Sequence, residues 1–175
     1  QGAIPPWLTT LNRFGRGKDI LVVPAAVEWR LALQRIEDAG RLRNAATDQV
    51  QLKISSLDMR VPANINGCPT WEAWDIAGVV VAAARGTLVP GTQVTVTQQW
   101  DVFVQPPGAL PCPGPVREPP PQLANGAEVT AFLNCKAQGQ CDLAAGRWSF
   151  VSPDAFDAER SRRMAAAAQA VRAQR

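Results

Sequence analysis

Residues 93–104 read QVTVTQQWDVFV, and their alternation decides the class of the fold. Apolar side chains such as Val94, Val96 and Trp100 recur at even positions, while Thr and Gln fill most of the odd ones. A period of two is typical of a β-strand with one face in a hydrophobic core and the other in water. The segment is therefore predicted to be a half-buried strand of a sheet.

Four other segments have strand patterns of their own. Residues 49–61 alternate in the same way, and residues 71–84 are apolar and β-branched at their centre. Gly78 interrupts the second of these runs and indicates a bulge or bend. Residues 128–133 and 147–151 complete about five strands. These patterns predict a small, closed or nearly closed five-stranded barrel of the OB type, with a β-sandwich as the alternative.

Two helices flank the predicted strands. Pro24 suits the first turn of a helix that continues to about residue 44, with Trp29, Leu33 and Ile36 at the spacing of one helix face. The tripeptide SPD at 152–154 combines a capping serine, a proline in the first turn and an acid, which predicts a second helix. The fold class is thus mainly β with flanking helices (α+β), divided into an extended arm (1–23), a core-packed helix (24–44), a barrel-like domain (45–152) with a proline-rich insertion (105–124), and a C-terminal helix (153–175).

The stretch 106–121 (PPGALPCPGPVREPPP) holds eight of the fifteen prolines. Each proline fixes φ and removes a backbone donor, so the stretch is predicted to be extended and polyproline-like. Two interpretations remain open. The stretch is either a rigid cover on the β-domain, or a ligand for a groove on another protein. In the second case the contacts would come from Pro106, Pro107, Pro119, Pro120 and Pro121.

The chain has four cysteines, and their even number favours two disulfides and an oxidising compartment. Cys135 and Cys141 would close a short loop containing Gly139, which leaves Cys68 and Cys112 to tether the proline stretch. Four cysteines allow three pairings, and free buried thiols or a metal site are the weaker alternatives because no tight C-x2-C pair occurs. With the start on glutamine instead of methionine, the pattern predicts signal-peptide removal and a periplasmic or secreted location.

The sequence contains no histidine and no tyrosine, but six tryptophans. Histidine is the commonest general base and a frequent metal ligand, so its absence lowers the expectation of catalysis. No glycine-rich phosphate loop, haem-attachment motif or dense carboxylate cluster is present in the sequence. The chain is therefore expected to be no enzyme, with no catalytic residue, no cofactor and no metal.

The segment WEAWD at 71–75 is the nearest approach to a ligand site. Aromatic side chains beside carboxylates suit a carbohydrate or another small ligand, which would involve Trp71, Trp74, Glu72 and Asp75. A hydrolase with a carboxylate pair is a less favoured alternative that would draw on Glu72, Asp75, Asp101 or Glu128. The simpler interpretation is that the tryptophans pack in the core, because aromatic burial dominates protein interiors.

Three appendages suggest a protein partner. The arm carries Trp7, Leu8 and Phe14, the proline stretch is described above, and the basic C-terminal helix offers Arg160, Arg163, Met164 and Val171. No apolar run is long enough to cross a bilayer, and the net charge of +3 is too mild to indicate nucleic acid. The sequence thus predicts a non-catalytic exported accessory subunit. Such a subunit would stabilise a partner protein in an envelope complex, of which a periplasmic oxidoreductase is one example, and would reach the membrane only through that partner.

Overall fold

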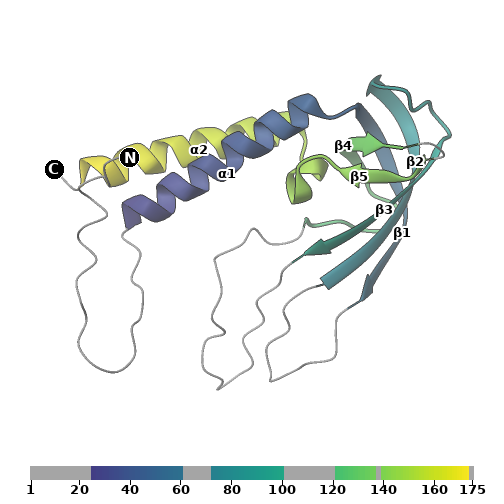
Figure 1. The fold of residues 1–175 in the computed structure, drawn as a ribbon, viewed down its shortest axis with the longest axis horizontal. Helices are drawn as coiled ribbons and strands as arrows, with labels where there is room; N and C mark the ends of the chain where they lie inside the picture. The colour runs from purple at the N-terminus through teal and green to yellow at the C-terminus, as the bar shows by residue number, and fades with distance from the viewer. Residues whose placement is uncertain (1–24, 61–71, 101–120, 137–138, 174–175) are drawn as a thin grey trace, which may run out of the picture.

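The computed structural model describes residues 25–60, 72–100, 121–136 and 139–173. Its elements form one antiparallel sheet and a pair of long helices, which confirms the α+β class (Figure 1). In chain order the elements are α1 (Ala25–Ala45), β1 (Asp48–Arg60), β2 (Glu72–Arg85), β3 (Gln93–Trp100), β4 (Glu128–Cys135), β5 (Cys141–Leu143), the 3-10 helix η3 (Gly146–Phe150) and α2 (Pro153–Arg172). The predicted extended segment before α1 lies outside the described residues.

The five strands are ordered β3-β2-β1-β4-β5. They form a single sheet, and not the two sheets of a sandwich. The edge strands β3 and β5 meet at one isolated parallel bridge, between Thr95 and Gln140. A closed barrel is therefore not observed, because β5 has only three residues and cannot form a continuous ladder with β3.

Irregular pairing between β1 and β2 bends the sheet. The register shifts at three points, one of them between Ile54 and Ser56, opposite Gly78. A Cβ atom at Gly78 would lie 2.8 Å from the Lys53 carbonyl oxygen and from Leu52 Cγ, so only glycine permits this close approach. The predicted bend at Gly78 is thus confirmed.

The main core lies on the concave side of this bent sheet. The alternating residues of β1 and β3 supply it, as their sequence pattern predicted, with Leu52 and Val94 almost fully buried. Trp74 and Trp100 meet edge to face with ring centroids 6.3 Å apart. Contacts of this kind add to the free energy gained from burying the two large rings.

The predicted strand at 147–151 is wrong. Residues 146–150 form η3, and the fifth strand is β5, which ends at Leu143. Gly146 has a φ of +54°, and the Ser149 hydroxyl accepts a hydrogen bond from the Ala145 amide at 2.8 Å. Trp148 and Phe150 are both buried, but they pack in two different hydrophobic clusters. Their spacing of two residues therefore resembles the alternation of a strand, although the backbone is helical.

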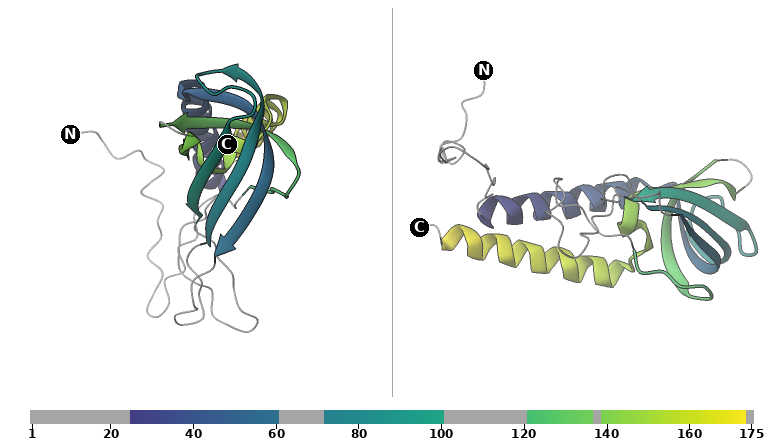
Figure 2. Two further views of the ribbon diagram at one scale, coloured as in Figure 1. Left: turned by 90° about the vertical axis from the view of Figure 1, so that its right-hand side faces the viewer. Right: turned by 90° about the horizontal axis from the view of Figure 1, so that it is seen from below.

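The two helices lie side by side and antiparallel, and their free ends point away from the sheet (Figures 1 and 2). The base of this hairpin is held by a second cluster, in which Ile36 and Ala39 of α1 meet Trp148 and Phe156. Ser152 caps α2 by accepting a hydrogen bond from the Ala155 amide at 3.3 Å. Both helices are therefore confirmed near their predicted starts, and α1 also near its predicted end.

Candidate functional site

A groove of about 510 Å³ lies at the base of the helical hairpin. The end of α1, the start of α2 and the strands β1 and β4 form its walls. Its size falls within the range of small-molecule sites in proteins. Its lining residues are Glu37, Gly40, Arg41, Arg43, Asn44, Gln49, Phe132, Pro153, Phe156, Asp157 and Arg160.

Arg43 is the buried cation of this groove. Its guanidinium lies 4.0 Å from the ring centroid of Phe132 and 4.2 Å from that of Phe156. Nη1 donates hydrogen bonds to the carbonyl oxygens of Trp148 at 2.8 Å and Val151 at 2.9 Å. Burial lowers the pKa of Arg43 to about 10, although the nearby charge of Asp157 opposes this shift. Arg43 thus joins α1 to the end of η3, and sequence reasoning did not single it out.

The other charges of the groove are also engaged within the chain. Arg160 Nε donates to Glu37 Oε1 at 2.6 Å, and this hydrogen bond and the charge of Glu37 raise the pKa of Arg160. Arg41 forms an ion pair with Asp38. The lining residues include no serine, threonine, cysteine or lysine. The arrangement holds two helices on the sheet and offers hydrogen bonds to a small polar molecule.

The predicted ligand cluster at 71–75 is divided between the faces of β2. Trp74 is buried in the core, and its Nε1 donates to Glu72 Oε2 at 3.1 Å. Asp75 Oδ2 pairs with Arg60 at 2.8 Å on the opposite face, and its Oδ1 accepts from Thr97. The structure therefore does not bring Glu72 and Asp75 together. Trp71 and Asp101 lie outside the described residues, and Glu128 begins β4, opposite Lys53.

Two of the predicted partner-binding arginines make contacts between the two helices of the hairpin. Arg163 is buried, and its Nε donates to Glu159 Oε1 at 2.7 Å while its Nη1 donates to the Ala32 carbonyl at 2.9 Å. Arg160 is paired with Glu37 as described above. Arg163 is thus directed toward α1 and not toward solvent, because its position on α2 recurs on the same face as Phe156.

Of the other partner-binding candidates, Met164 is exposed and Val171 is partly exposed. Pro121 is described and buried. The candidates outside the described residues are Trp7, Leu8, Phe14, Pro106, Pro107, Pro119 and Pro120.

The cysteine prediction is confirmed where the structure describes it. Cys135 and Cys141 form a disulfide across the β4–β5 turn, with Cα atoms 4.0 Å apart. Inside this loop, a Cβ atom at Gly139 would lie 2.1 Å from the Gln93 carbonyl oxygen, so the loop approaches β3 closely. Cys68 and Cys112 lie outside the described residues.

Removal of this disulfide is expected to lower the free energy of unfolding by about 2 kcal/mol, the value for so short a loop. The double substitution Cys135→Ser and Cys141→Ala leaves the β4–β5 ladder in place but releases the loop from β3. Urea unfolding without reductant, followed by tryptophan fluorescence, measures the change against the parent protein. Equal midpoints for the parent and the double variant would show that this disulfide does not stabilise the fold.

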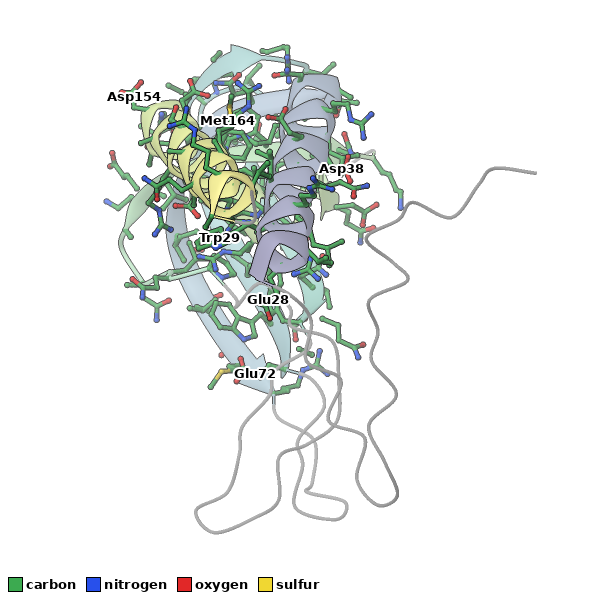
Figure 3. All side chains as sticks on the ribbon, turned by 90° about the vertical axis from the view of Figure 1, so that its left-hand side faces the viewer. Glu28, Trp29, Asp38, Glu72, Asp154 and Met164 are labelled. Atoms are coloured by element: carbon green, nitrogen blue, oxygen red, sulfur yellow. A yellow bond between two sulfur atoms is a disulfide. The ribbon has the colours of Figure 1, made fainter. Side chains whose placement is uncertain are left out.

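The hairpin exposes large apolar side chains away from its base. Trp29 is 37% exposed and Met164 is 49% exposed. The sequence predicts Trp29 on the core face of its helix, together with Leu33 and Ile36. Trp29 lies near the free end of α1, where the sheet does not cover this face. Figure 3 looks along the hairpin from this end and shows Met164 toward the upper side of the helical pair and Trp29 toward its lower side. We call Trp29 and Met164 the tip surface.

Within the described residues, neither helix has the length and apolarity needed to cross a membrane. No group of three His, Cys, Asp or Glu side chains in the described ranges could hold a metal ion. Comparison with protein-family models, with curated proteins and with solved structures finds no match to this chain.

Proposed function

We propose that this chain is a non-catalytic, exported accessory subunit that docks on a partner protein through the tip surface of its helical hairpin. The observation that carries the proposal is the free end of the hairpin, which leaves the sheet and exposes Trp29 and Met164.

The energetics of helices support a partner at this end. Most of the stability of helices in proteins comes from the packing of an apolar face, and not from helix propensity. The base of the hairpin has such packing through Ile36 and Phe156. Toward the free end, α2 offers a run of alanines, of which Ala167 is buried. A partner that covers Trp29 and Met164 supplies the apolar contact that the sheet supplies at the base.

The location belongs to the same proposal. The disulfide between Cys135 and Cys141 supports a periplasmic or secreted chain, because disulfides persist in oxidising compartments. The sheet is then the scaffold that carries the hairpin. The order β3-β2-β1-β4-β5, with β3 and β5 meeting in parallel, supports an OB-like barrel that is open along that seam.

Site-specific photo-crosslinking of the full chain in its source organism tests the docking surface. A photoreactive residue in place of Trp29 or Met164 is expected to yield one covalent adduct of defined mass. The matched control is Val89, which is 62% exposed in the β2–β3 turn at the far side of the sheet. Adducts from Val89 but not from the tip surface would contradict the proposal.

A loss-of-binding variant makes the same test quantitative. The double substitution Trp29→Asp and Met164→Asp is expected to abolish co-purification of the crosslinked partner while far-UV circular dichroism stays unchanged. Undiminished co-purification by a folded variant would overturn the assignment of the surface.

A further inference from the structure

The face of α1 that points away from α2 carries a regular pattern. Leu31, Arg35, Asp38 and Leu42 follow one another at intervals of four, three and four residues, which places them on one stripe of the helix. We call these four residues the outer seam. Leu31 and Leu42 are 46% and 51% exposed. Figure 3 shows Asp38 on the side of α1 that is remote from α2.

The spacing and chemistry of the outer seam are those of a helix-pairing surface. Alternating intervals of three and four residues define the contact positions of a coiled coil. A leucine stands at each end of the seam, and two opposite charges occupy the middle. One of them, Asp38, also pairs through Oδ1 with the exposed Arg41 of its own helix. Leu31 and Leu42 are about 16 Å apart along the helix, at a rise of about 1.5 Å per residue.

The seam is complementary to itself in one orientation only. When two copies of α1 pack antiparallel about a two-fold axis between residues 36 and 37, Leu31 of each copy lies opposite Leu42 of the other. The same axis places Arg35 of each copy opposite Asp38 of the other. Parallel packing would instead oppose like charges at both central positions. Buried polar residues in coiled coils fix orientation and register in this way.

We propose that the chain forms a reversible symmetric dimer through the outer seam, with two leucine pairs and two ion pairs repeated by the two-fold axis. A symmetric interface uses the same patch on both copies, which is the arrangement the seam provides. The four residues make a small interface, at the low end of the range for specific complexes, so the dimer exchanges with monomer as concentration changes.

This dimer goes beyond the proposed accessory function and does not depend on it. The outer seam and the tip surface lie on different faces of the hairpin. A second copy can therefore occupy the seam while a partner occupies the tip surface. Substitutions in one surface leave the other unchanged, so failure of one proposal is distinguishable from failure of the other.

Charge reversal tests the pairing directly. Arg35→Asp gives a chain with carboxylates at both central positions, and Asp38→Arg gives a chain with guanidinium groups at both. Each variant alone is expected to dimerise at least about tenfold more weakly than the parent, since each homodimer opposes like charges. An equimolar mixture of the two is expected to form a heterodimer, because every central pair then joins opposite charges. Sedimentation equilibrium of the purified full chains, with one variant carrying a mass tag, measures both effects.

Two controls separate pairing from folding. Ser161→Asp adds a carboxylate to an exposed position of α2 and is expected to leave the dimer constant unchanged. Leu42→Lys, which removes apolar contact on both sides of the axis, is expected to weaken the dimer at least about tenfold. A parent chain that stays monomeric at all concentrations would overturn the proposal. Binding of the parent only to a different protein, or a mixture no more dimeric than its separate components, would do the same.

Discussion

Replacement of Arg43 by alanine is expected to lower the free energy of unfolding by about 3 kcal/mol, because it leaves buried hydrogen-bond acceptors unsatisfied and opens a cavity. The substitution leaves the carbonyl oxygens of Trp148 and Val151 without the donor they now share. It also opens a cavity between the rings of Phe132 and Phe156. Because these contacts fix η3 and the start of α2 to α1, the base of the hairpin is expected to loosen first.

Conservative variants and a neighbour on the same helix refine this test. Arg43→Lys keeps the positive charge but loses the planar group that stacks between the two rings, so it is expected to recover only part of the loss. Arg41→Ala removes an arginine whose side chain is 80% exposed, and is expected to change stability by no more than about 0.5 kcal/mol. Urea unfolding followed by fluorescence measures all three. A loss of similar size for Arg41→Ala and Arg43→Ala would refute the structural role assigned to Arg43.

Asp48→Asn is expected to be the second most destabilising change, at about 2–3 kcal/mol. The Asp48 carboxylate is 1% exposed and accepts hydrogen bonds from the amides of Thr87 at 2.7 Å and Leu88 at 3.1 Å. It also accepts from the Thr47 hydroxyl at 2.6 Å. Asparagine keeps one oxygen for the two amides, but it turns its NH2 group toward the Thr47 hydroxyl and removes the negative charge that strengthens all of these hydrogen bonds. Gly86 has a φ of +109° and lies against the Asp48 carboxylate. A Cβ atom at Gly86 would lie 2.1 Å from Asp48 Oδ1, so the close approach requires glycine.

The same carboxylate makes stability depend on pH. Burial alone would raise the pKa of Asp48, but the hydrogen bonds from Thr47, Thr87 and Leu88 together outweigh burial and lower it. A folded-state pKa below the unfolded-state value means that the stabilisation is complete above about pH 4 and is lost as pH falls through the folded-state pKa.

Unfolding measured from neutral to acidic pH tests this dependence. The difference in the free energy of unfolding between the parent and Asp48→Asn is expected to shrink as the pH falls below about 4. Asp58→Asn, an exposed position on the same strand, is the matched control. A difference that stayed constant down to low pH would contradict the role assigned to the carboxylate.

Much of the secondary structure was predictable because it depends on local periodicity. The alternation in β1 and β3 gave both strands and their core faces, and the cap at Ser152 gave the start of α2. The error at 147–151 has a physical cause. Apolar residues that divide between two clusters produce an alternation like that of a strand, although the backbone curls into η3.

The candidate site was much less predictable. Nothing in the sequence distinguishes three buried charged residues from exposed ones, namely Arg43, Asp48 and Arg163. Their partners are remote: Arg43 binds the Trp148 carbonyl 105 residues away, and Arg163 binds the Ala32 carbonyl 131 residues away. No local sequence pattern predicts such a contact, since the contact depends on how the helices and the sheet pack together. The division of Glu72 and Asp75 between two faces is a local feature by contrast, since residues three apart in a strand point to opposite faces.

The sequence by itself determined both helices and the strands β1 to β4, and it predicted both the bend at Gly78 and the disulfide between Cys135 and Cys141. These features depend on side-chain period, backbone freedom and short chain distances, all of which are local. The tertiary structure alone decided that the sheet stays open between β3 and β5, that Arg163 of α2 is buried against α1, and that the hairpin leaves Trp29 uncovered. Burial and electrostatic pairing are properties of elements brought together in space, so they are decided only by the packing of the whole chain.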